Sequence, residues 1–243
     1  MERIFALASS VAADALRRKV LYVVVFFVLV MAVAVPSLPS YGEGVDEAVY
    51  REVTLALVFV AALIVVLALA APRIPAEVEH RTVYNVLSKN VYRWEYLAGL
   101  WCGIVFTMAW IIAAFTVIAQ IVGFAVYADP MWVLWQGTLG VLLEVGVLAA
   151  LCIAAASRLS TVPVVLVALV FLFAAHSRSS VVLDDASLAW KLYPSLDTFN
   201  VINPVAHGGG VDAAYVVSML LVFVAYSAFL LVLAALLFKG RDL

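Results

Sequence analysis

Glu144 has the most unusual surroundings of any acidic residue in this sequence, because it lies inside a long apolar run from Met131 to Ala156. An ionisable side chain in such a run is costly unless it faces a cavity or a partner. We therefore predict that Glu144, together with Gln120 on the preceding apolar run, lines a polar path between helices. The sequence leaves open a second interpretation, in which Glu144 hydrogen-bonds to an adjacent helix and serves packing.

Other residues that could carry chemistry do not form a recognisable site. His176 and His207 flank a segment with several carboxylates, but the spacing of these groups is too loose to predict a metal site. The sequence has no Gly-x-x-x-x-Gly-Lys-Ser/Thr phosphate loop, no Gly-x-Ser-Gly and no His-Glu-x-x-His. Gly208-Gly-Gly-Val-Asp212 does not reproduce an aspartyl-protease Gly-x-Gly-Asp motif. We expect no catalysis by this chain, and an intramembrane hydrolase is the least favoured alternative.

The elements that must position these residues are membrane helices. The chain has 243 residues, of which 67% are hydrophobic and only 12% charged, whereas soluble domains are about half apolar and a quarter charged. Backbone groups in hydrocarbon must be satisfied internally, and the apolar runs lack the alternation of a membrane barrel, so the fold class is an all-α integral membrane protein. Six transmembrane helices are predicted, at residues 20–35, 53–71, 96–127, 131–156, 159–175 and 211–238.

The basic residues predict the orientation of these helices. Eleven of the 14 Lys and Arg residues precede the first span, follow the last, or lie between spans two and three or four and five. Only Arg51, Arg178 and Lys191 lie in the opposite loops, which also collect most of the acids. By the positive-inside rule, both termini are predicted to be cytoplasmic, and residues 176–210 to form an outer helical loop.

The N-terminal segment, residues 1–19, has apolar residues on one side of a helical wheel and charged residues on the other. We predict a helix that lies in the plane of the inner leaflet. A cleavable signal peptide is the competing interpretation, although its charged region would be unusually long.

The longest predicted cytoplasmic loop runs from Pro72 to Tyr96 and mixes both charge signs with regularly spaced apolar residues. Helix is expected to stop at the two prolines and to resume after Pro75, giving a short amphipathic surface helix over residues 76–90. A solvated connecting loop is the alternative. The residues of interest here are Glu77, Glu79, His80, Arg81, Val83, Leu87, Ser88 and Lys89.

The same loop resembles the type-2 ABC transporter permeases, in particular the short six-span group that includes NosY-like and gliding-motility permease subunits. Members of that group carry an acidic residue, an Arg-Thr pair, a Leu-Ser-Lys stretch and Arg-x-Glu-Tyr in this order after the second span. This chain has Glu79, Arg81-Thr82, Leu87-Ser-Lys89 and Arg93-Trp-Glu-Tyr96 in the same order. It departs from the pattern at Asn90, where Pro is common, and at Tyr92, where a small residue is usual.

The resemblance implies a permease subunit that pairs with a second copy or a homologue and with two cytosolic ABC ATPase subunits, in the inner membrane of a prokaryote. Residues 1–19 would be the elbow helix, and residues 76–90 the coupling helix seated on the ATPase. ATP and magnesium would bind to the ATPase, with no cofactor in this chain, and an extracytoplasmic accessory subunit is possible. The export path would lie at the permease dimer interface. The alternative is a nucleotide-independent binding or scaffold subunit of the energy-coupling-factor kind.

Overall fold

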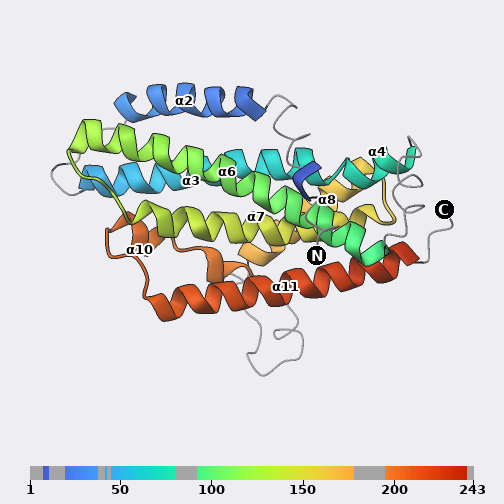
Figure 1. The fold of residues 1–243 in the computed structure, drawn as a ribbon. Coiled ribbons are helices and arrows are strands. Elements are labelled where there is room, and N and C mark those ends of the chain that lie inside the picture. The colour runs from blue at the N-terminus through green and yellow to red at the C-terminus, as the bar shows by residue number, and fades with distance from the viewer. Residues whose placement is uncertain are drawn as a thin grey trace.

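The computed structural model describes residues 8–10, 20–37, 42, 45–79, 92–177 and 195–239, and every element in these ranges is a helix. The longer helices lie side by side with their axes roughly parallel (Figure 1). Their bounds are α2 Val20–Ser37, α3 Val45–Ala70, α4 Arg73–Glu79, α6 Arg93–Tyr127, α7 Leu134–Ala156, α8 Thr161–His176, the 3-10 turn η2 Asp197–Phe199, α10 Ile202–Ala206 and α11 Ala213–Lys239.

Each of the six predicted apolar segments is helical. Four helices of the described part of the chain are long and apolar enough to cross a membrane, with α3 and α4 taken together as one. Helix α8 is apolar but shorter. The chain therefore has the composition and architecture of a helical membrane protein, while the count of six spans stays a prediction.

Helix α7 is the centre of the bundle, with α3 and α6 on one side and α11 on the other (Figure 1). Most of its residues are buried, and much of its surface is built from Gly and Ala, which let neighbouring backbones approach closely. A Cβ atom at Gly140 would collide with the backbone oxygen of Phe199 in η2. The side chain of Thr138 donates a hydrogen bond to the Leu134 carbonyl four residues back, and Thr107 and Thr116 do the same on α6. These three hydroxyls are thus satisfied within their own helices.

Helix α4 corrects one expectation. The predicted surface helix begins after Pro75, whereas α4 begins at Arg73 and contains Pro75 in its first turn. Proline is compatible with this position because the first N–H groups of a helix have no intrahelical acceptor. The Ala76 N–H donates to the Pro72 carbonyl at 2.9 Å. Residues 80–90 of the predicted helix, and all of residues 1–19 except 8–10, lie outside the described residues.

The predicted outer loop, residues 176–210, contains packed structure in its second part. Turn η2 lies against α7, and α10 lies against α3 and α7. Their apolar side chains, Leu196, Phe199, Val201 and Val205, are almost completely buried. This segment therefore folds back onto the helices instead of extending away from them.

Two ends of the bundle can be distinguished by charge. We call the end at which α4 and the C-terminal part of α11 lie the basic end, because Arg73, Arg93, Arg158 and Lys239 are found there. The opposite end, with Glu47, Asp129 and α10, is the acidic end. In Figure 1 the basic end is on the right, near α4, and the acidic end is on the left, near α10.

Candidate functional site

The basic end holds α4 against the rest of the bundle through Glu77. One carboxylate oxygen of Glu77 lies 2.7 Å from Arg73 Nε, one turn earlier on α4. Its other oxygen accepts a hydrogen bond from the Tyr96 hydroxyl of α6. The Tyr96 ring is buried, and so is Ile74, which anchors the apolar side of α4. A half-buried carboxylate with these two partners ties α4 to the first turn of α6.

Helix α11 also ends at the basic end of the bundle. Arg93 Nη1 donates to the carbonyl oxygens of Phe238 and Lys239 at 3.1 and 3.2 Å, and Arg158 Nε donates to Leu237 O at 2.9 Å. These are among the last carbonyls of α11, which have no intrahelical donor and carry the negative end of the helix dipole. The Phe238 ring stacks on Tyr96 with 6.1 Å between centroids. The starts of α4 and α6 and the end of α11 thus form one junction, and a displacement of α4 would be transmitted to α6 and α11.

Of the residues predicted to contact an ATPase, the described part of the chain contains two. Glu77 is half-buried in the junction just described, whereas Glu79, at the end of α4, is exposed. The remaining predicted contact residues lie outside the described residues: His80, Arg81, Val83, Leu87, Ser88 and Lys89.

Glu144, the predicted path residue, is 4% exposed and lies near the middle of α7. Its Oε1 atom lies 3.3 Å from His176 Nε2 on α8. The two groups form an ion pair only when His176 is protonated, and Oε1 has no hydrogen-bond partner among the described residues. Asp197 in η2 is close enough to act on Glu144 electrostatically. Two ionisable side chains, from α7 and α8, therefore meet in an otherwise apolar part of the bundle.

His176 does not lie where the sequence places it. The prediction assigns it to an outer loop beyond the fifth span, whereas it is the last residue of α8 and contacts the middle of α7. The reason is the length of α8, since 16 residues extend only about 24 Å from the basic end. One sign of this was visible in the sequence, because the predicted fifth span of about 17 residues is too short to cross a hydrocarbon core of about 30 Å.

Gln120 does not join Glu144. Its side-chain oxygen accepts a hydrogen bond from Trp135 Nε1 at 3.0 Å, and its amide donates to Pro130 O at 3.2 Å. Both partners belong to the α6–α7 connection and the start of α7, which lie at the acidic end. The described contacts of Gln120 therefore connect α6 to α7 and do not bring it to Glu144, and the placement of both residues on one transport path stays a prediction.

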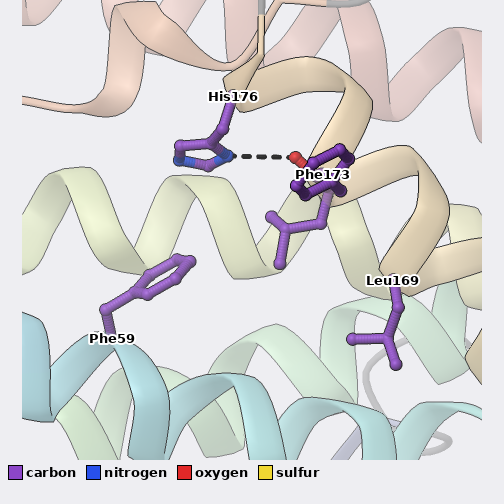
Figure 2. Close-up of a pocket in the computed structure, with 5 residues that line it drawn as sticks. Phe59, Leu169, Phe173 and His176 are labelled. Atoms are coloured by element: carbon purple, nitrogen blue, oxygen red, sulfur yellow. Dashed lines mark hydrogen bonds between the residues drawn. The ribbon is translucent and has the colours of Figure 1, made fainter.

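A pocket of about 440 Å³ adjoins the Glu144–His176 pair. Phe59 of α3 forms one wall, and Leu169, Leu172, Phe173 and His176 of α8 form the other. Figure 2 shows the Phe59 ring pointing across the gap toward α8, with the His176 ring above it. The two ring centroids are 6.0 Å apart, and His176 Nδ1 is 3.1 Å from Leu172 O. We call this pocket the α3–α8 groove.

At the acidic end, sequence reasoning missed a junction around Arg51. Its guanidinium lies 2.7 Å from Asp129 Oδ2 and 3.1 Å from Glu47 Oε2, and donates to Ala206 O at 3.2 Å. Arg51 is 8% exposed, and its contacts join α3 to the α6–α7 connection and to α10. Glu47 and Arg51 are one helical turn apart, a spacing visible in the sequence, but nothing in the sequence pairs Arg51 with Asp129.

The described residues contain no group of three or more His, Cys, Asp or Glu side chains placed to hold a metal ion. His207, the second predicted flanking histidine, contacts the Asn203 carbonyl through Nδ1 at 2.9 Å. Asp184 and Asp185 lie outside the described residues.

Comparison with known proteins adds no family to these observations. No family model matches the sequence, and the curated proteins include no relative with a significant match.

Proposed function

We propose that this chain is the transmembrane permease subunit of an ATP-driven ABC transporter of the type-2 group. Two such chains, or one chain and a homologue, would form the path, and two cytosolic ABC ATPases would supply the energy. The chain itself would not hydrolyse ATP. Export or extrusion of a substrate is the direction that the resemblance favours.

The observation that carries the proposal is the attachment of α4 to α6 at the basic end. A coupling helix must receive a push from an ATPase and pass it to membrane helices. Helix α4 ends with Glu79, where the segment that resembles the family motif begins, and the Glu77–Tyr96 hydrogen bond connects it to α6, which holds the end of that segment. Covalent continuity with α3 provides a second connection, since only Ala71 and Pro72 separate α3 from α4. ATPase closure would therefore tilt α3 and α6 together.

The position of Glu144 supports a path through the middle of the bundle. Ionisable residues inside membrane proteins are rare and usually mark substrate or proton pathways. Glu144 lies beside the α3–α8 groove, which opens at the bundle surface. In the proposed dimer this surface faces the second permease, and the basic end faces the cytoplasm.

Co-purification from the native membrane tests the proposal. We expect a stoichiometric ABC ATPase to accompany the tagged chain, and substrate-dependent ATP hydrolysis by the complex. Arg81→Glu reverses a charge in the predicted coupling segment and is expected to leave the chain inserted while uncoupling transport from ATP hydrolysis. Transport and ATPase rates are measured together on the reconstituted complex.

Lys239→Glu is the matched control, because it makes the same charge reversal at the basic end, on an exposed side chain outside the coupling segment. Full coupling of transport to ATP hydrolysis in the Arg81→Glu complex would show that the predicted coupling segment takes no part in the mechanism. A stable complex without any ATPase would overturn the proposal in favour of a nucleotide-independent binding subunit.

A further inference from the structure

His176 presents both of its ring nitrogens to oxygen atoms. Its Nδ1 atom is 3.1 Å from the Leu172 carbonyl oxygen, and its Nε2 atom is 3.3 Å from Glu144 Oε1. A carbonyl oxygen can only accept a hydrogen bond, so the Leu172 contact requires a proton on Nδ1. In a neutral imidazole the other nitrogen, Nε2, is then an acceptor without a proton. Beside an ionised Glu144 it would place lone pair against lone pair.

The contact is therefore satisfied only when one further proton lies between Nε2 and Oε1. That proton sits either on His176, which gives an ion pair, or on Glu144, which gives a neutral acid that donates to the ring. The surroundings favour the neutral acid. Glu144 is 4% exposed, and Oε1 accepts no hydrogen bond from the described residues. An ionised carboxylate in that position is costly, and desolvation of both partners offsets the attraction within an ion pair.

Few other charges bear on this pair. Asp197 of η2 acts on Glu144 electrostatically, and the α3 residue that faces His176 is the uncharged Phe59. The other charged or histidine side chains on the described elements packed against α7 lie near the two ends of the bundle. They are Asp46, Glu47, Arg51 and Glu52 on α3, Arg73, Glu77 and Glu79 on α4, Arg93 and Glu95 on α6, His207 after α10, and Lys239 on α11.

We propose that Glu144 and His176 form a proton-binding site, in which protonated Glu144 donates to the neutral His176 ring and holds the end of α8 against α7. Within the described part of the chain, no other side-chain hydrogen bond or ion pair joins α8 to another helix. The buried residues of α8 are the apolar Val164, Ala168 and Ala175. The proton is thus the polar fastening of this helix.

Loss of the proton would release the end of α8. A base in the solvent takes the proton, the O–H bond of Glu144 breaks, and its electron pair stays on the carboxylate. The carboxylate then faces the Nε2 lone pair, so the two helices are expected to separate there. The His176 side chain is 33% exposed and lines the α3–α8 groove, whereas that of Glu144 is 5% exposed, so the exchange proceeds from the groove.

Infrared spectroscopy of the purified chain locates the proton. A protonated carboxyl group has a C=O stretching band that a carboxylate lacks, and a maltoside detergent adds no carbonyl of its own. We expect this band at neutral pH in the wild type, its loss at alkaline pH, and its absence from Glu144→Gln. Asp212→Asn is the matched control, because Asp212 is an exposed carboxylate at the start of α11, and it should keep the band.

A wild-type chain without the band at neutral pH would overturn the inference in favour of an ion pair. A band that persists in Glu144→Gln and disappears in Asp197→Asn would assign the proton to the wrong carboxyl group and overturn it as well. The wild-type spectrum decides the first outcome even where a variant fails to fold.

The position of α8 is measured separately. Spin labels are attached at Val60 of α3 and Val170 of α8, which are 52% and 68% exposed, after Cys102 and Cys152 are replaced by alanine. Double electron–electron resonance gives the distance between them. We expect it to lengthen from neutral to alkaline pH in this chain. With Glu144→Gln it should stay short at both, because the Gln amide donates to Nε2 as the protonated acid does.

An unchanged distance in the chain with native Glu144, while the infrared band disappears, would show that the proton does not hold α8. Equal lengthening in Glu144→Gln would show that another group responds to pH. The inference goes beyond the proposed function and does not rest on it, because both measurements use the purified chain without ATPase or nucleotide. Failure to co-purify an ATPase would therefore leave it standing.

Discussion

At the scale of single residues, the Glu144–His176 pair is the most consequential contact in the bundle. Both side chains come from helices whose other residues are almost entirely apolar. Glu144 is buried and His176 is half-buried, and such a pair contributes little net stability, because desolvation offsets the attraction between the partners. Removing one partner is a different matter, since it leaves the other polar group in an apolar environment without compensation.

His176→Leu is accordingly expected to lower the free energy of unfolding by about 1–3 kcal/mol. The double variant Glu144→Leu with His176→Leu should recover most of this loss, because no isolated carboxylate remains. Unfolding of the purified chain in a denaturing detergent, measured for both singles and the double, gives the coupling energy.

His207→Leu is the control, because the His207 ring is exposed and its hydrogen bond within the described part of the chain is to the Asn203 carbonyl of its own turn. A His176→Leu chain as stable as the His207→Leu chain would show that the pair does not interact in the folded protein.

At the scale of elements, the contact between α7 and the η2 segment depends on the absence of a side chain at Gly140. Gly140→Ala would place a methyl group against the Phe199 carbonyl, so the segment would have to move away from α7. We expect a loss of about 1–3 kcal/mol in stability, as for other overpacked sites, and faster amide exchange over residues 195–206.

Gly209→Ala is the matched substitution, because a Cβ atom there would meet only Pro204 O at 3.8 Å, an ordinary contact. Hydrogen exchange followed by mass spectrometry compares the two variants. Equal protection of residues 195–206 in both would disprove a tight α7–η2 contact.

The sequence predicted the apolar helices of the described residues well, and it predicted their mutual contacts poorly. Long runs of Leu, Val and Ala have one stable solution in lipid, so α6, α7 and α11 begin and end within three residues of the predicted bounds. Helix α3 begins at Val45, eight residues before the predicted 53. The prediction missed the first turns of this helix because they are charged. The apolar criterion stopped at that charge, whereas the helix continues to the junction of Glu47 with Arg51.

The candidate site was only half predictable for the same reason. Glu144 is conspicuous in its own run, but its partner His176 depends on where α8 stops relative to α7. The Tyr96–Glu77 and Arg51–Asp129 contacts join residues far apart in the chain, and hydrophobic periodicity carries no information on such pairs. No family model matches this sequence, so related proteins could not be used to predict these contacts.

At the scale of the whole molecule, the polar contacts between helices concentrate at two ends. The basic end joins α4, α6 and α11, and the acidic end joins α3, α10 and the α6–α7 connection. Between them, apart from the Glu144 pair and the hydrogen bond from Trp101 Nε1 to Gly146 O, the described contacts are largely apolar packing. When one end of such a bundle is displaced, its helices are expected to tilt together as a rigid body.

The proposed orientation can be measured by cysteine labelling. The two native cysteines, Cys102 and Cys152, lie inside α6 and α7 and are replaced by alanine. A single cysteine at Asp212 should react with a membrane-impermeant maleimide in intact cells, and one at Lys239 only after permeabilisation. Reaction of the Lys239 position in intact cells would reverse the assignment of the two ends.

The separation of Glu144 and His176 along the chain also bears on how the protein is made. Helix α7 leaves the ribosome before α8, so Glu144 enters the insertion machinery about 30 residues before its partner exists, a delay of seconds at ordinary rates of synthesis. Release of α7 alone into lipid would leave its carboxylate without compensation. We therefore expect α7 to wait at the translocon for α8, so that the two helices enter the bilayer as a hairpin with the pair already formed.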